Sequence, residues 1–116
     1  MQFDKDICVE AHISDLHFGA FDPEKQYNIL KKQFIDKIKI LKNLSLISIN
    51  GDLFHHKYMA NSDAVFFAIK FVEDLVQLSK ELHCTLFILH GTPSHDAGQT
   101  KLFYQYMNNP DVDVRV

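Results

Sequence analysis

The chain has 116 residues, of which 47% are hydrophobic and 23% are charged, and its formal net charge is −3. This length allows one domain or part of one, and the charge provides no basic field that would by itself indicate a nucleic-acid partner. The sequence has no secretory leader and no apolar run long enough to span a membrane, which predicts a cytoplasmic protein without membrane contact. Cys8 and Cys84 lie far apart in apolar stretches and are expected to be buried free thiols, as is typical of a reducing compartment.

Alternating apolar residues predict strands, and apolar residues at helical spacing predict helices. Asp22, Pro23 and Glu24 form a helix start, with a capping side chain, a proline at the first helical position and an acid that the helix dipole favours. The second helix is expected to bury Phe66 together with its aliphatic neighbours. In chain order we expect a strand over 7–13, a helix over 23–42, a strand over 44–49, a helix that opens at 61–63, a strand over 85–89, a short helix over 100–107 and a strand from 112.

Alternating strands and long helices indicate an α/β fold with a parallel β-sheet and right-handed helical crossovers. Both long helices are then expected on one face of the sheet, which leaves an uncovered apolar face on the other side. Such a surface promotes association, so we expect the isolated 116 residues to aggregate or oligomerise.

Each of the first three predicted strands leads into an aspartate or a histidine beside a glycine. Asp15 and His17 follow the first strand, Asp52 follows the second, and His95 and Asp96 follow the third. Asp and His two positions apart point the same way along an extended chain, so both side chains can converge on one ion. Because the loops after parallel strands emerge at one edge of a sheet, we expect these five side chains to lie together.

Carboxylate oxygens together with imidazole nitrogens suit Mn²⁺, Fe or Zn²⁺. A carboxylate between two ions roughly 3.5–4 Å apart can bridge them, a common device for hydrolysing phosphate esters, and Asp52 on the middle motif is the natural bridge. The sequence has neither the P-loop nor the Rossmann glycine pattern. A triad of Ser94, His95 and Asp96 is disfavoured, because adjacent residues cannot easily orient one another.

These motifs resemble the first three motifs of the calcineurin-like metallophosphoesterases. The stretches 12–19 and 51–55 are similar to the DNA-repair exonuclease branch of that family, which includes the nuclease subunit of the bacterial SbcC–SbcD complex. The resemblance implies that residues 1–116 are the N-terminal half of an αββα sandwich, a partial domain whose remaining metal-binding histidines lie beyond Val116. The isolated chain is then expected to show no Mn²⁺-dependent cleavage of DNA.

The resemblance also implies a role for each matching residue. Asp15 and His17 would hold the first metal ion, and Asp52 would bridge two divalent ions, most readily Mn²⁺, with Fe or Zn²⁺ as alternatives. His95 would contact the scissile phosphate and protonate the leaving oxygen, Asp96 would orient its imidazole, and metal-bound hydroxide would be the nucleophile. His55 would lie close to the substrate. The implied partners are DNA and an SbcC-like ATPase subunit, with a homodimer as a further option.

The chain departs from the family pattern at Ser94, where the family has an asparagine that ligates the second metal. Ser94 therefore stands as a substrate-binding candidate, and occupancy of the second metal site is left open. Two classes of function follow. One is a metal-dependent phosphodiesterase acting on DNA, or on a phosphoprotein or small phosphoester. The other is a non-catalytic module that keeps the fold and one metal and serves as a docking surface.

Overall fold

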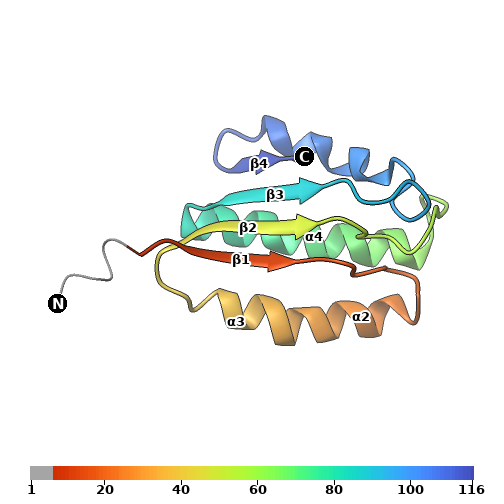
Figure 1. Cartoon of the computed structure of the whole chain (residues 1–116), viewed down its shortest axis with the longest axis horizontal. Helices are drawn as coiled ribbons and strands as arrows, with labels where there is room; N and C mark the ends of the chain where they lie inside the picture. The colour runs from red at the N-terminus through yellow and green to blue at the C-terminus, as the bar shows by residue number, and fades with distance from the viewer. Residues whose placement is uncertain (1–6) are drawn as a thin grey trace.

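Four parallel strands form one sheet in the order β1-β2-β3-β4 (Figure 1). The computed structural model describes residues 7–116. Within this range the order of the strands in the sheet is the same as their order in the chain. This arrangement confirms the predicted α/β class with a parallel sheet. The strands are β1 (Val9–Ile13), β2 (Leu44–Asn50), β3 (Thr85–Leu89) and β4 (Asp113–Arg115).

The first crossover is a helical rod whose start agrees with the prediction and whose end does not. The rod comprises α2 (Pro23–Leu30), the π-helical turn η1 (Lys31–Ile35) and α3 (Asp36–Ile38). The side chain of Asp22 accepts a hydrogen bond from the Glu24 N–H at 3.1 Å, which caps the first turn. The rod ends at Ile38, before the predicted end at residue 42. Ile40, which follows it, is 76% exposed and therefore does not pack against the core.

The second crossover is α4 (Asp63–Leu82), which begins where the sequence predicts because the Ser62 hydroxyl accepts from the Val65 N–H at 3.3 Å. The last connection is the 3₁₀ helix η2 (Gln99–Asn108) between β3 and β4. Helices α2 and α4 contact each other, and α4 lies behind the sheet in Figure 1.

The hydrophobic core lies between the sheet and these helices. Its fully buried members include Ile47 and Ile49 from β2, Leu86 and Ile88 from β3, and Phe71 from α4. The prediction that Phe66 belongs to the buried face of α4 is wrong, because its side chain is 59% exposed. One residue along a helix is a rotation of about 100°, which carries Phe66 off the face that contains the buried Val65.

The other face of the sheet is open in Figure 1. It is mixed rather than wholly apolar as expected, because Leu46, Phe87 and Leu89 share it with polar residues. Strands alternate their side chains, and the open-face positions carry Glu10 and His12 on β1 and Ser48 on β2. His12 contacts Glu10 Oε1 through Nε2 at 2.9 Å and the Ser48 hydroxyl through Nδ1. At the far end of this face the Arg115 guanidinium covers Phe87, 5.4 Å from the ring centroid. Paired polar groups therefore occupy much of the uncovered surface.

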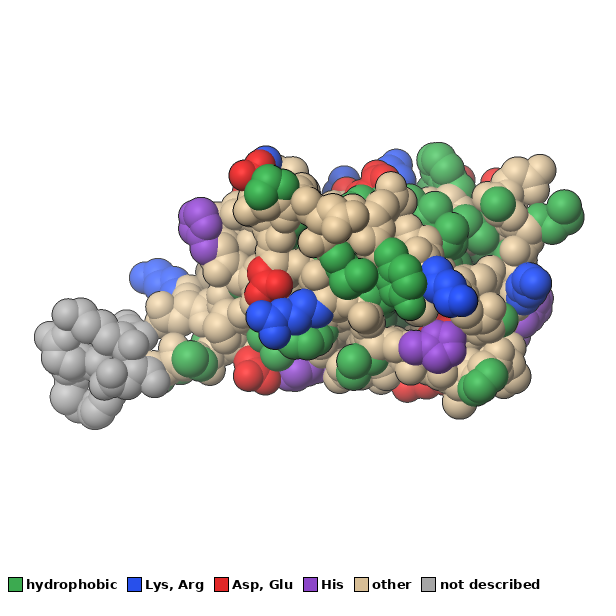
Figure 2. All heavy atoms as spheres, turned by 90° about the horizontal axis from the view of Figure 1, so that it is seen from above, with side chains coloured by type: hydrophobic (Ala, Val, Ile, Leu, Met, Phe, Trp, Pro, Cys, Tyr) green, Lys and Arg blue, Asp and Glu red, His purple; other side chains and the backbone are tan. Residues whose placement is uncertain are grey.

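The remaining surface mixes charged and apolar side chains. Figure 2 shows one face of the molecule, on which hydrophobic side chains are interspersed with charged groups of both signs. Cys84 is buried as expected, whereas Cys8 is exposed because it precedes the first residue of β1. Within residues 7–116, none of the helices has the length and apolar character that would let it cross a membrane.

A hydrogen bond between Tyr27 on α2 and Asp74 on α4 leads to a prediction about stability. The Tyr27 hydroxyl donates to Asp74 Oδ2, and burial together with this carboxylate raises the pKa of Tyr27 to about 12. Tyr27→Phe should lower the free energy of unfolding by about 1 kcal/mol near neutral pH, since one hydrogen bond is lost. Because the folded-state pKa is the raised one, this contribution is complete below about pH 10 and disappears as the pH approaches 12.

Urea denaturation at pH 7 and pH 11 measures both effects, with Tyr104→Phe as the matched control because Tyr104 is 46% exposed. Equal unfolding free energies for wild type and Tyr27→Phe at pH 7 would contradict the assignment of this hydrogen bond.

Candidate metal centre

The loops after β1 and β2 run side by side beyond the carboxyl ends of the strands. His17 N–H donates to the carbonyl of Asp52 at 3.0 Å. Phe18 and Phe54 then form an isolated parallel bridge, and both side chains are fully buried. This pairing extends the sheet contact past its last regular residues, so the two motif loops are fixed relative to each other.

Three of the predicted site residues occupy the left-handed region of the backbone. The φ angles are 55° for Asp15, 51° for His17 and 55° for Asp52. A residue other than glycine in this conformation costs on the order of 1–3 kcal/mol, and such residues cluster at functional sites. The surrounding contacts must therefore impose these angles.

One glutamine side chain supplies part of that constraint, and a second holds the loop after β2. Gln26, on α2 and 4% exposed, accepts from the Gly19 N–H at 2.9 Å and donates to the carbonyl of His17 at 3.2 Å. Gln99, on η2, accepts from the Tyr58 N–H at 3.0 Å and donates to the carbonyl of His56 at 3.0 Å. We did not predict either glutamine as a site residue. The only sequence signal is their position at the start of the helix that follows a motif loop.

Asp96 has a different role from the predicted one. It is fully buried, and its carboxylate accepts from three backbone N–H groups, those of Asp52 at 3.0 Å, Gly91 at 2.6 Å and Phe54 at 3.0 Å. The prediction that Asp96 orients His95 is therefore wrong for this structure, since both carboxylate oxygens accept hydrogen bonds from backbone N–H groups. The carbonyl of His55 holds the imidazole instead, 2.5 Å from His95 Nδ1.

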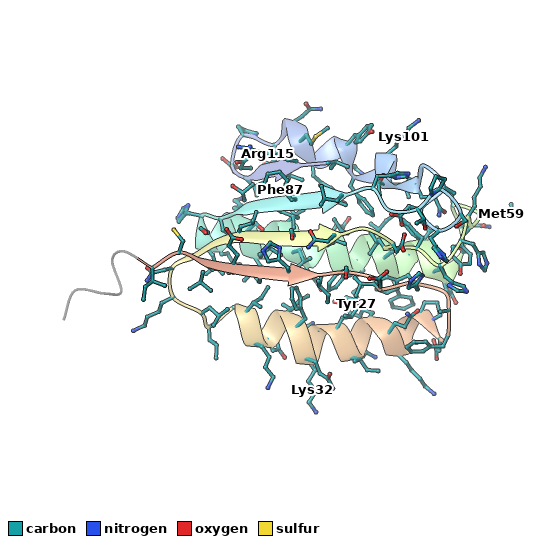
Figure 3. The ribbon with its side chains drawn as sticks, in the orientation of Figure 1. Tyr27, Lys32, Met59, Phe87, Lys101 and Arg115 are labelled. Atoms are coloured by element: carbon teal, nitrogen blue, oxygen red, sulfur yellow. The ribbon has the colours of Figure 1, made fainter. Side chains whose placement is uncertain are left out.

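Asp15, His17 and Asp52 converge as the sequence predicts. One ligand atom from each of these residues lies within 4.8 Å of the others, which is close enough to hold a metal ion. A second group with the same property consists of His17, His55 and His95. Both groups lie in the loops after the strands, at the end of the molecule that Met59 marks in Figure 3. Sequence analysis predicted the first group and missed the second.

Thr92 contacts the carboxylate of Asp52. Its backbone N–H donates to Asp52 Oδ1 at 2.8 Å, and its hydroxyl contacts the same oxygen at 3.0 Å. The backbone hydrogen bond is the main reason that the pKa of Asp52 lies below its usual value. Desolvation raises this pKa, whereas the Thr92 hydroxyl, His95 and His17 lower it further. This shift favours the anionic form of Asp52, and both contacts from Thr92 are to Oδ1. Thr92 was not among the predicted site residues.

The remaining predicted residues lie in contrasting positions. Ser94 is exposed in the turn between β3 and η2, and Thr92 rather than Ser94 contacts Asp52. His55 lies within the histidine group, with its ring centroid 5.5 Å from that of His17. Desolvation is the largest cause of a lowered pKa at His55, and the neighbouring His56, His17 and His95 add to it. His55 therefore favours the neutral form, which is the form that binds metals.

A scan against known families finds no matching family model, and no curated protein matches the sequence significantly. The resemblance to metallophosphoesterases therefore depends on the short motifs described above.

The packing around Gly91 yields a prediction about the metal centre. A Cβ atom at this position would lie 2.2 Å from both the backbone N and Oδ1 of Asp52. Gly91→Ala should therefore displace Asp52 and weaken Mn²⁺ binding by about 10- to 100-fold, the usual range when support of a ligand is lost. Isothermal titration calorimetry measures the affinity.

Gly98→Ala is the matched control, because a Cβ there meets nothing within 4 Å, although its φ of +75° adds some strain. Gly98→Ala should lower stability slightly and leave Mn²⁺ affinity at the wild-type value. Equal affinities for the two variants would show that the contact with Asp52 has no part in metal binding.

Proposed function

We propose that this protein is a metal-dependent phosphoesterase that hydrolyses phosphodiester bonds, with DNA as its substrate. The observation that carries the proposal is the convergence of Asp15, His17 and Asp52 beside His95, whose ring centroid lies 4.5 Å from that of His17. A cation held by two carboxylates and an imidazole can stabilise the negative charge that develops on the phosphate, and a neighbouring imidazole can transfer a proton. These are the two requirements for cleaving a phosphate ester.

The donor atoms fit a divalent ion of the Mn²⁺, Fe or Zn²⁺ class. Asp15 and Asp52 offer carboxylate oxygens, and His17 offers an imidazole nitrogen. The hydrogen bonds from Thr92 hold Asp52 in the anionic form that binds a cation. When bound, such an ion polarises a phosphoryl oxygen and lowers the pKa of water.

His95 is oriented to move a proton. The carbonyl of His55 can only accept, so the proton of this hydrogen bond belongs to His95 Nδ1. The other ring nitrogen, Nε2, is then the atom that exchanges a proton with the leaving oxygen. His55 contributes through its backbone in this scheme, in addition to the substrate contact that its motif suggests.

The contacts of Asp52 bear on whether the site would hold one ion or two. Its Oδ1 already accepts two hydrogen bonds from Thr92, so a second ion would have to share Oδ2 with the first. The exposed Ser94 does not take the place of the asparagine in the family pattern. These observations favour one tightly held ion, and they also support the second candidate, a metal-binding docking module without catalysis. An ATPase partner rests on the motif resemblance alone.

Removing the central carboxylate should abolish metal binding. We expect Asp52→Ala to lose Mn²⁺ binding altogether, because it removes the anion on which the group is centred. Asp111→Ala is the control, since Asp111 is exposed and only faces Lys80 at 3.8 Å. Isothermal titration calorimetry of the 116-residue chain compares the variants. An unchanged Mn²⁺ affinity in Asp52→Ala would sink the metal-centre proposal.

Removing the proton-transfer group should separate chemistry from binding. In the natural protein His95→Gln should lower the turnover of a DNA substrate by roughly 10²-fold or more, while Mn²⁺ affinity stays at the wild-type value. His56→Gln serves as the control. Full activity in His95→Gln would rule out His95 as the proton-transfer group, and loss of Mn²⁺ would make His95 a ligand of the carboxylate group. Absence of activity in the wild type would favour the docking module.

A further inference from the structure

The second metal-binding group consists only of histidines. The ring centroid of His17 lies 4.5 Å from that of His95 and 5.5 Å from that of His55, and in both pairs the rings meet nearly edge to face. One nitrogen from each of the three rings lies within 4.8 Å of the others. Three different loops therefore bring imidazoles to one point: the loop after β1, the loop after β2 and the loop after β3.

Two ring nitrogens in this group lack hydrogen-bond partners. His17 Nδ1 and His55 Nδ1 are buried, and neither makes a hydrogen bond with any residue in 7–116. A buried polar atom without a partner is costly, and most such atoms in folded proteins are satisfied by another group or by a bound ion. His95 Nδ1 donates to the carbonyl of His55, which leaves His95 Nε2 for a ligand.

We propose that His17, His55 and His95 form a second cation site, one that takes Zn²⁺ in preference to Mn²⁺. Three neutral imidazoles with an open fourth position are a common zinc coordination, whereas Mn²⁺ prefers oxygen donors. Zinc–nitrogen bonds of about 2.0–2.1 Å in a tetrahedral site place the nitrogens about 3.3 Å apart. The separations within the group are short enough for modest side-chain rotations to reach this spacing.

The two sites exclude each other because they share His17. A neutral imidazole has one nitrogen with a free lone pair, since the other carries the proton. His17 can therefore serve either the carboxylate group or the histidine group, but not both at once. Zn²⁺ in the histidine group would also engage His95 and remove it from proton transfer.

Zn²⁺ would therefore act as an inhibitor that displaces the activating ion. This regulatory consequence rests on the proposed function, whereas the existence of the histidine site does not. The two can fail separately, and direct binding measurements distinguish them.

The test measures Zn²⁺ affinity of the chelator-treated 116-residue chain by competition with a zinc-binding dye. His55→Gln removes one imidazole of the histidine group and no ligand of the carboxylate group, so it should weaken Zn²⁺ binding by about 100-fold or more and leave Mn²⁺ affinity unchanged. His56→Gln is the matched control, because this neighbouring histidine is exposed and stands outside both groups. Its Zn²⁺ affinity should equal that of the wild type.

A second measurement keeps the outcome clear if a variant folds poorly. Zn²⁺ added to wild-type protein loaded with Mn²⁺ should release one Mn²⁺ per Zn²⁺ bound, which the electron paramagnetic resonance signal of free Mn²⁺ reports. Asp15→Asn should show the converse pattern, with weakened Mn²⁺ binding and wild-type Zn²⁺ affinity.

Wild-type Zn²⁺ affinity in a folded His55→Gln variant, or Zn²⁺ binding without release of Mn²⁺, would overturn the proposal. If Zn²⁺ binding depends on His55 but the natural protein shows no phosphoesterase activity, the proposed function is refuted and the histidine site stands.

Discussion

The buried carboxylate of Asp96 is the contact on which the rest of the site depends. It accepts the N–H groups of Asp52, Gly91 and Phe54, so one side chain joins the loop after β2 to the loop after β3. The loop after β1 is attached to this unit through the hydrogen bond from His17 N–H to the Asp52 carbonyl. Hydrogen bonds to a charged acceptor contribute about 1.5–3 kcal/mol each, which is comparable with the cost of the strained backbone at Asp15, His17 and Asp52.

The fold and part of the site followed from the sequence because they depend on local rules. Alternation and helical spacing located the strands and crossovers, and the capping side chains of Asp22 and Ser62 fixed where α2 and α4 begin. The direction of parallel strands then brought Asp15, His17 and Asp52 to one edge. Each of these steps uses only the order of residues along the chain and the geometry of regular elements.

The rest of the site depends on loop conformation, which periodicity does not encode. Asp96 and His95 are neighbours in the chain, yet Asp96 turns into the interior while His95 joins the histidine group. The hydrogen bonds from Thr92 to Asp52 and the position of His55 likewise arise from the irregular backbone after β2 and β3. The polar residues on the open face of the sheet were missed for another reason. We assigned an apolar character to the whole sheet, although Glu10, His12 and Ser48 occupy alternate positions along their strands.

The position of His17 connects the identity of the bound ion to the chemistry of the site. On one side of this imidazole are carboxylates, which select hard cations, and on the other side are imidazoles, which select Zn²⁺. A residue with a single free lone pair cannot satisfy both groups, so the site must choose between them. Because His95 belongs only to the histidine group, the choice would also decide whether His95 is free for its proposed role in proton transfer. Under the proposed function, the same three loops would hold either an activating ion or an inhibiting one.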